Sequence, residues 1–361
     1  MDPKEFNHCH FVLDHRFNGH HAYYSSFVKT SLYKNIFLFC THPPGQLSTD
    51  KFLINLRHFH RYYFPLEVFI NFFICFFFFL FTSRANCVVH VHGVANVAPL
   101  LASRLLRFKT IWYLHECNKS FCSLFDFAFY FPFIISPIVV VVSKQISSTY
   151  SVSDFFHIPG SIDTSFWTPC NSFHNDSLPV NFLTIANLNP DKGIHLLLDS
   201  LAAVDIPISL QIAGSPLKTH HQYYVSLRAQ VALINKQTHH HVELLGFLSP
   251  FQLLDAFERT QFFILPSLTE AHPISLLQAL SCGIPSIVTN TGSCSEILPA
   301  CLHSFLIPPN DIKSLSHSIF SLSCVSRHQY STLSKHSRQV IVDNYSNHRF
   351  SELLSNLYLL L

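Results

Sequence analysis

The C-terminal half of the sequence alternates short apolar segments with segments of helical periodicity. The apolar segments are predicted strands at residues 181–187, 208–213, 242–245, 262–265, 284–289 and 304–307. Between the first two, Ile194, Leu197, Leu198 and Leu201 are spaced so that they share one face of a helix. Strands and helices that alternate in this way predict an α/β fold with a doubly wound parallel sheet.

One of these helices has a clear N-terminal signal. Ser249 and Pro250 fit the N-cap and the first position of a helix. Helical spacing then predicts that Phe251, Leu254 and Phe257 face inward.

The N-terminal half shows a similar but noisier pattern. Its predicted strands are residues 11–13, 35–40, 87–91, 110–113 and 138–142. Residues 164–180 are polar, contain proline and lack periodicity, which is typical of a linker. We therefore expect a first domain at 1–165, a linker at 166–180, a second domain at 181–345 and a C-terminal helix at 346–361 that packs back on the first domain. Two Rossmann-like domains joined in this way would face a cleft, which is a preferred ligand site.

Composition excludes several classes of protein. Of the 361 residues, 48% are hydrophobic and 12% are charged, so the chain is not disordered. A net charge of +2 gives no case for a nucleic-acid partner. The 11 cysteines form no CxxC pair, and the first ten residues are too polar for a signal peptide, so a reduced, cytoplasmic protein is expected.

A phenylalanine-rich run begins at Phe69 and ends at Phe81. It covers about 13 residues, whereas a membrane-spanning helix needs about 20. Two interpretations stay open: a buried helix, or an apolar face that docks peripherally on the cytoplasmic surface of a membrane.

The most informative segment is residues 262–285. A buried strand ends at Leu265, Glu270 lies in the following loop, and a helix is predicted from Pro273 to just before Gly283. The first helical residues offer free N–H donors that favour an anion; they are Ile274, Ser275 and Leu276. Because ligands bind at the carboxyl ends of parallel strands, a carboxylate beside an anion site suits a sugar nucleotide.

Several motifs occur in the order found in one enzyme family. The second half carries IANLNPDKG, LQIAGSP, VELLGFL and LPSLTEAHPISLLQALSCGIPSIVTNTGSCSEIL, and the first half carries FNGHHAYY, CVVHVHG, WYLHE and VVVSK…IPGSID. The chain resembles the retaining glycosyltransferases of the GT-B fold, in family 4, also called group 1. The resemblance implies transfer of a sugar from a nucleotide-sugar donor to a glycan or lipid-linked acceptor, as in polysaccharide or lipopolysaccharide biosynthesis. It also implies retention of configuration and no metal or other cofactor.

The resemblance assigns roles to individual residues. Lys192, which we expect at the third position of a helix capped by Asn189, would stabilise the departing nucleoside diphosphate. Glu270 and His115 are the candidate catalytic residues. Glu270 would contact the donor sugar, and His115 would contact a sugar hydroxyl or the acceptor. The remaining candidate donor-binding residues are Gly19, Asn187, Gly214, Ile274, Ser275, Leu276 and Gln278. We expect Lys192 and Glu270 to converge on the donor.

Two positions depart from the family pattern. Gln278 replaces the second glutamate, which would bind the ribose, and Asn187 replaces a phosphate-binding arginine. A neutral amide keeps hydrogen bonds but loses charge. Two alternatives to an active transferase therefore stay open: a non-catalytic relative that binds sugar nucleotide, and a sugar-nucleotide epimerase of the same fold.

Overall fold

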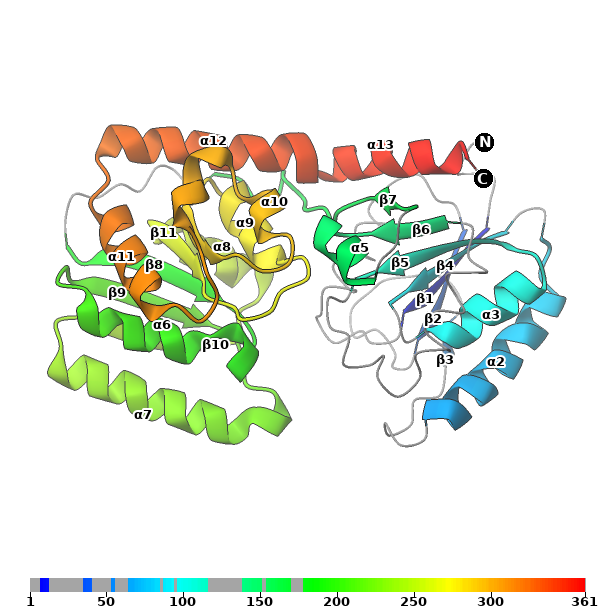
Figure 1. The fold of residues 1–361 in the computed structure, drawn as a ribbon, viewed down its shortest axis with the longest axis horizontal. Helices are drawn as coiled ribbons and strands as arrows, with labels where there is room; N and C mark the ends of the chain where they lie inside the picture. The colour runs from blue at the N-terminus through cyan, green and yellow to red at the C-terminus, as the bar shows by residue number, and fades with distance from the viewer. Residues whose placement is uncertain are drawn as a thin grey trace. The chain divides into compact units, whose positions relative to one another are not determined.

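The computed structural model describes residues 7–12, 35–40, 53–55, 64–84, 87–93, 96–115, 138–150, 154–169 and 178–360 (Figure 1). The chain divides into two compact units. The first unit contains residues 1–161 and 347–361, and the second contains residues 162–346. Residues at the start of the predicted linker pack in the second unit, where Trp167 is buried against Phe257.

The first unit is built on a seven-stranded sheet in the order β3-β2-β1-β4-β5-β6-β7. All neighbouring strands are parallel. The strands are β1 (Asn7–Val12), β2 (Asn35–Cys40), β3 (Leu53–Asn55), β4 (Cys87–His92), β5 (Lys109–Leu114), β6 (Ile138–Val141) and β7 (Phe156–His157). Strands β4 and β6 are buried along their whole length. Burial on both faces explains the continuous apolar sequence of β6, whereas β4 also buries His90 and His92.

Four helices of this unit are described: α2 (Phe64–Leu80), α3 (Val97–Leu105), α5 (Lys144–Tyr150) and α13 (Asn347–Tyr358). Helix α2 packs against α3, and the rings of Phe79 and Phe108 lie 4.8 Å apart. Helix α13 is held to β4 by a hydrogen bond of 2.8 Å between the Tyr358 hydroxyl and Nε2 of His90. Within the described residues, no helix is long and apolar enough to cross a membrane.

The second unit has a six-stranded parallel sheet in the order β10-β9-β8-β11-β12-β13. Its strands are β8 (Val180–Ile185), β9 (Ile208–Ala213), β10 (His241–Gly246), β11 (Phe262–Leu265), β12 (Ser286–Thr289) and β13 (Leu306–Ile307). Its α-helices are α6 (Ile194–Ser200), α7 (His221–Gln237), α8 (Pro250–Glu258), α9 (Ile274–Ser281), α10 (Cys294–Ile297), α11 (Ile312–Ser323) and α12 (Arg327–Tyr345).

Both faces of this second sheet are covered. In β11, Phe262 and Ile264 join one apolar cluster, while Phe263 and Leu265 join another. Helices α6, α7 and α11 contribute to the first cluster, and α8, α9 and α12 to the second. Alternate residues of a strand point to opposite faces, so a fully apolar strand requires helices on both sides. The predicted fold class, α/β with doubly wound parallel sheets, is confirmed.

The N-terminus of α8 confirms one prediction and contradicts another. Ser249 is the N-cap, with its hydroxyl accepting from the Gln252 N–H and the Gln252 side chain accepting from the Ser249 N–H. Phe257 is fully buried, but Phe251 is 71% exposed, so its predicted inward orientation is wrong. Phe251 lies in the first turn of α8, outside the core, where its ring centroid is 5.4 Å from that of the half-buried Phe166.

Candidate functional site

The candidate site lies where the order of the second sheet reverses. From β8 the chain adds β9 and then β10 on one side, and it later adds β11, β12 and β13 on the other. Strands β8 and β11 are parallel neighbours, so the loops that follow them begin side by side. Such a reversal point is where open α/β sheets bind ligands. Lys192 follows β8 and Glu270 follows β11.

The loop after β8 ends in a short 3-10 turn, Pro190–Lys192. Gly193 then adopts a left-handed conformation with φ +63°, and α6 begins after it. Lys192 is at the third position of a helix that begins at Pro190, as predicted, but this helix is a single 3-10 turn and the expected capping hydrogen bond of the Asn189 side chain is not made. The turn is short because the left-handed backbone of Gly193 ends it after Lys192.

The two loops are packed directly on each other. A Cβ atom at Gly193 would lie 2.1 Å from the carbonyl oxygen of Pro266, so only glycine allows this approach. The N–H of Leu268 donates to the carbonyl oxygen of Asp191 at 2.7 Å. Lys192 is thereby held against the loop that carries Glu270.

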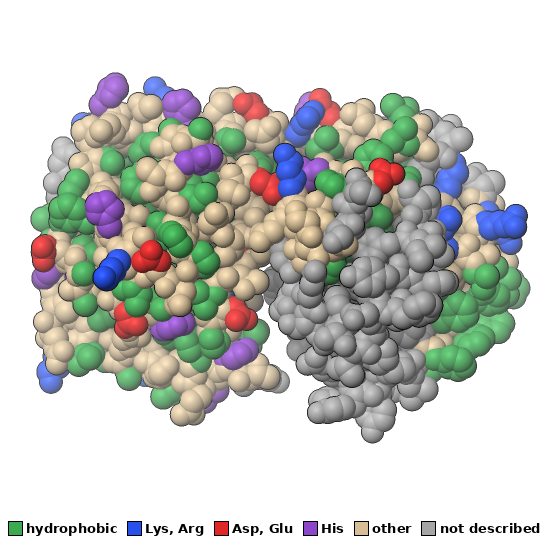
Figure 2. Space-filling view, viewed as in Figure 1, with side chains coloured by type: hydrophobic (Ala, Val, Ile, Leu, Met, Phe, Trp, Pro, Cys, Tyr) green, Lys and Arg blue, Asp and Glu red, His purple; other side chains and the backbone are tan. Residues whose placement is uncertain are grey.

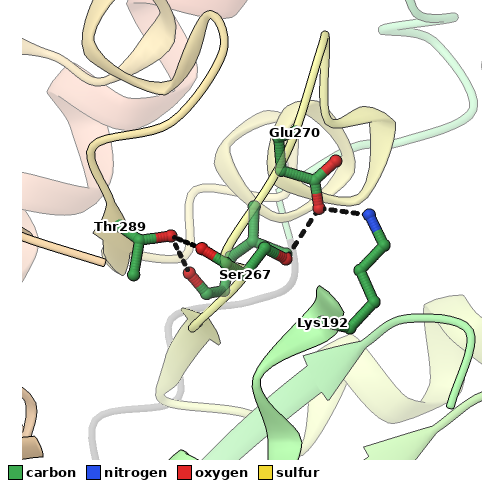
Figure 3. A network of polar contacts seen from close by, with 5 residues as sticks. Lys192, Ser267, Glu270 and Thr289 are labelled. Carbon is green, nitrogen blue, oxygen red and sulfur yellow. Dashed lines mark hydrogen bonds and ion pairs between the residues drawn. The ribbon is translucent and has the colours of Figure 1, made fainter. Parts of the chain in front are cut away.

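Lys192 and Glu270 form an ion pair (Figure 3). Nζ of Lys192 lies 2.6 Å from Oε1 of Glu270, and the two side chains are 22% and 11% exposed. The hydroxyl of Ser267 donates to the same Glu270 oxygen at 2.7 Å. The expectation that positions 192 and 270 converge agrees with this geometry, although both residues belong to the second unit.

The carboxylate rests on a rigid polar support. The Thr289 hydroxyl, at the end of β12, donates to the carbonyl oxygens of Ser267 at 2.5 Å and Leu265 at 3.3 Å (Figure 3). Both Ser267 and Thr289 are buried. These hydrogen bonds connect the end of β12 to the end of β11 and to the start of the loop that carries Glu270, and they hold that loop in position.

A buried thiol lies within electrostatic range of the pair. Burial, with a further contribution from the Glu270 carboxylate, raises the pKa of the Cys294 thiol to about 12. Cys294 therefore stays protonated at neutral pH and is not a nucleophile there. The N–H of Ser293 donates to the Ala271 carbonyl oxygen at 3.0 Å, so the loop after β12 also packs on the loop of Glu270.

Helix α9 supplies backbone donors beside the same loop. Pro273 is its N-cap, and the N–H groups of Ile274 and Ser275 have no acceptor among the described residues. The prediction of a free N–H at Leu276 is wrong, because that group donates to the Pro273 carbonyl oxygen at 3.2 Å in a tight first turn. Gln278 lies further along the helix and is partly exposed.

The other predicted donor-binding residues of this unit lie at the same edge of the sheet. Gly214 follows β9 with φ +145°, and its N–H donates to the Gly246 carbonyl oxygen at 2.7 Å. A Cβ atom at Gly214 would lie 1.8 Å from the Ala186 carbonyl oxygen. Asn187 is exposed in the neighbouring loop after β8. Asn187, Lys192, Gly214 and Glu270 thus all follow strands β8, β9 or β11.

The two predicted site residues of the first unit are placed differently. Gly19 lies outside the described residues. His115 directly follows β5, is 6% exposed, and its Nε2 lies 3.1 Å from Nδ1 of His92. The His92 ring also stacks on Tyr113 with centroids 4.6 Å apart. His115 is therefore held in a buried stack of rings at the C-terminal edge of that sheet.

Two buried hydroxyl residues that support the site, Ser267 and Thr289, belong to none of the predicted site positions. Ser267 and Thr289 each stand at or just after the carboxyl end of a strand, in LPS and IVT. A small hydroxyl residue at that position of an apolar strand is the signal that could have identified them. Among the described residues, no group of three His, Cys, Asp or Glu side chains could hold a metal ion.

Comparison with known families agrees with this geometry. Residues 174–352, which contain the whole candidate site of the second unit, match the family model described as glycosyl transferases group 1. The chain belongs to the group 1 glycosyltransferases. The resemblance inferred from the motifs is confirmed.

Individual members of the family that resemble the chain are distant in sequence. A putative colanic acid biosynthesis glycosyltransferase, WcaL of Salmonella typhimurium, is 21% identical over 50% of the chain and 45% of the relative. One component of the phosphatidylinositol N-acetylglucosaminyltransferase of Arabidopsis thaliana is 26% identical over 58% of the chain and 42% of the relative. The matches thus span less than half the length of these curated relatives.

Among solved structures, HepE of Anabaena in complex with UDP has a TM-score of 0.80 at 13% identity, with 99% of this chain and 100% of that chain covered. At this identity the likeness shows the fold alone. The chain therefore has the GT-B fold, with two parallel sheets.

Proposed function

We propose that the chain transfers a sugar from a nucleotide-sugar donor to a glycan or lipid-linked acceptor, with retention of configuration and without a metal ion. The observation that carries the proposal is the Lys192–Glu270 pair, set at the reversal point of the second sheet. The α9 N-terminus, which offers two N–H donors, follows Glu270 by four residues. A group 1 glycosyltransferase with a cation, a carboxylate and free amides in this region has the groups that a diphosphate-linked sugar requires.

Each group has a distinct role in this proposal. The Lys192 ammonium and the N–H groups of Ile274 and Ser275 bind the diphosphate and stabilise the negative charge that develops as it leaves. Glu270 orients the sugar hydroxyls and stabilises positive charge at the anomeric carbon. The diphosphate competes with Glu270 for Lys192, so donor binding would release the carboxylate to the sugar. Ser267 keeps Glu270 in position during that exchange.

The remaining assignments are also proposals. His115 contacts the sugar or the acceptor, with His92 fixing its ring. Gln278 and Asn187 bind the nucleotide through neutral amides, and Gly214 allows close approach of the backbone to the donor. The complex of HepE with UDP supports a uridine nucleotide as the first donor to test. The names of the Salmonella and Arabidopsis relatives support a polysaccharide or a lipid acceptor.

Substitution of the carboxylate tests the proposal. Glu270→Ala is expected to abolish sugar transfer while circular dichroism and the melting profile stay those of a folded protein. Glu258→Ala, at an exposed position of the same unit, is the matched control and should keep full activity. Normal turnover in Glu270→Ala would remove Glu270 from the mechanism.

A non-catalytic relative is the second candidate, and Asn187 favours it. This exposed amide stands where the family pattern expects a fixed positive charge for the phosphates. Calorimetric titration with several nucleotide sugars, run beside a product assay, separates the two. Binding without turnover supports the non-catalytic relative. A change of the sugar in a donor-only incubation would instead indicate an epimerase.

A further inference from the structure

Helix α2 exposes a stripe of aromatic side chains. Phe69, Phe73 and Phe77 are four residues apart and are 61%, 40% and 56% exposed. Residues at this spacing share one face of a helix, and the rings of Phe69 and Phe73 lie 4.9 Å apart. The opposite face, with Cys75 and Phe79, is buried. The interpretation of α2 as a buried helix therefore holds for one face only.

More apolar side chains are exposed where α2 ends and at the neighbouring ends of other elements. Phe81, which follows α2, is 90% exposed, and Leu105 at the end of α3 is 64% exposed. Leu360, which follows α13, is also 64% exposed. The Phe79–Phe108 ring contact connects the end of α2 to a cavity that Phe108 and Leu360 both line.

The same region of the first unit is basic. The cavity has a volume of about 500 Å³, and the described residues that line it include Arg104, Arg107, Lys109 and one carboxylate, Asp154. Arg84 and Arg107 are exposed and form no ion pair among the described residues. Figure 2 shows hydrophobic side chains at the right of the view with Lys and Arg side chains beside them, where Figure 1 shows α2.

Arg107 also occupies an unusual backbone conformation. Its φ of +60° is left-handed, and its N–H donates to the Arg104 carbonyl oxygen at the end of α3. Glycine is the residue commonly found at this position of a helix terminus. A cation is therefore present where the local backbone would favour glycine.

We propose that this region is a docking surface for an anionic phospholipid membrane. The surface is defined by the exposed side chains of Phe69, Phe73, Phe77, Phe81 and Leu105 together with the exposed cations Arg84 and Arg107. Exposed aromatic rings enter the boundary between headgroups and acyl chains, and adjacent cations are attracted to anionic lipids. The positive charge favours an anionic membrane over a second copy of the chain as the binding partner, because a second copy would bring the same cations against one another. The proposal does not depend on the transfer reaction.

Vesicle binding of the full chain tests the proposal. The probes are phosphatidylcholine vesicles with and without phosphatidylserine, and no sugar donor is present. Arg84→Gln/Arg107→Gln is expected to weaken binding to the anionic vesicles about 30-fold, because each of the two cations makes its own contribution to the affinity for anionic lipid and the two losses multiply in the binding constant. Phe69→Ser/Phe73→Ser/Phe77→Ser is expected to weaken it by about 100-fold or more.

Matched controls come from exposed positions of the second unit. Val225→Ser/Leu233→Ser/Phe320→Ser and Arg228→Gln/Arg259→Gln remove the same kinds of side chain and should bind like the unaltered protein. Each variant is checked for folding by circular dichroism.

The outcomes are decisive in either direction. Binding that requires phosphatidylserine and is lost only in the α2 and Arg84/Arg107 variants supports the proposal. No binding, equal binding to neutral vesicles, or equal loss in the control variants overturns it. Self-association that the phenylalanine substitutions abolish, without vesicle binding, would identify a second copy as the occupant and also overturn it.

Discussion

The ion pair between Lys192 and Glu270 makes a quantitative prediction about stability. We consider Lys192→Met, Glu270→Gln and the double variant. An exposed ion pair contributes about 0.2–1 kcal/mol, while breaking a buried pair costs about 3–5 kcal/mol. With side chains 22% and 11% exposed, this pair lies between these limits. We therefore expect each single substitution to lower the unfolding free energy of the second unit by about 2 kcal/mol.

The structure also orders the two single variants. Glu270 is the less exposed partner, so Lys192→Met leaves the more desolvated charge unpaired and should cost more. In Glu270→Gln the amide oxygen can still accept from Ser267. The double variant removes both charges and should lie within about 1 kcal/mol of the unaltered protein. The two single effects would sum to about 4 kcal/mol, so the coupling between the two sites should be about 3 kcal/mol.

Urea unfolding measures these free energies, provided that the fluorescence signal comes from the second unit alone. The chain has two tryptophans, Trp112 in the first unit and Trp167 in the core of the second. A Trp112→Phe background makes Trp167 fluorescence specific for the unit that contains the pair. Single-variant effects that add to the double-variant effect within about 0.5 kcal/mol would refute the reasoning.

Two further predictions concern the surroundings of the pair. Gly193→Ala should destabilise the second unit by more than about 2 kcal/mol and lower turnover, because its Cβ would lie 2.1 Å from the Pro266 carbonyl oxygen. Gly246→Ala is the control, because it also has a positive φ but no atom within 4 Å, and should cost about 1 kcal/mol in the same urea assay. The raised pKa of Cys294 predicts alkaline lability: above a pH of about 9 the unfolded thiol ionises while the folded one does not, so unfolding free energy falls by about 1.4 kcal/mol per pH unit. Cys294→Ala should lessen that slope when unfolding is measured between pH 8 and about 11; an unchanged slope would contradict the assignment.

Apolar runs in the sequence predicted the longer strands of both sheets. The strands at residues 35–40 and 208–213 match β2 and β9 at both ends. The strand at residues 262–265 also matches β11 at both ends, and β11 is buried along its whole length between two parallel neighbours, so its apolar signal is continuous. Strands β3 and β7 contain only three and two residues, which is too few to show a period.

The errors occurred where a local pattern competes with backbone geometry. Asn189-Pro190 has the composition of a helix start, yet left-handed Gly193 ends the turn after Lys192. Phe251 has the spacing of an inward residue, yet it lies one turn before the core begins. Both patterns are present in the sequence. The local sequence does not show, however, that another loop packs against Gly193 or that the core ends before Phe251.

The pairing of Lys192 with Glu270 is a property of the sheet order. The two residues are separated by 78 positions, and no periodicity connects them. They meet because β8 and β11 are adjacent strands, and this adjacency follows from the reversal of the sheet. The resemblance to a family provided the pair, whereas residue patterns alone provided only two separate loop residues.

The energetics of the pair favour a role in binding over a role in stability. Well-packed apolar residues of similar volume are often as stabilising as a desolvated ion pair, or more so. Stability therefore gives no reason to keep Lys192 and Glu270 at the reversal point, with Ser267 and Thr289 buried beneath them. A ligand that carries both negative and hydroxyl groups does give a reason, because it uses both partners of the pair. The double variant is therefore expected to keep the stability of the protein and to lose its affinity for nucleoside diphosphate.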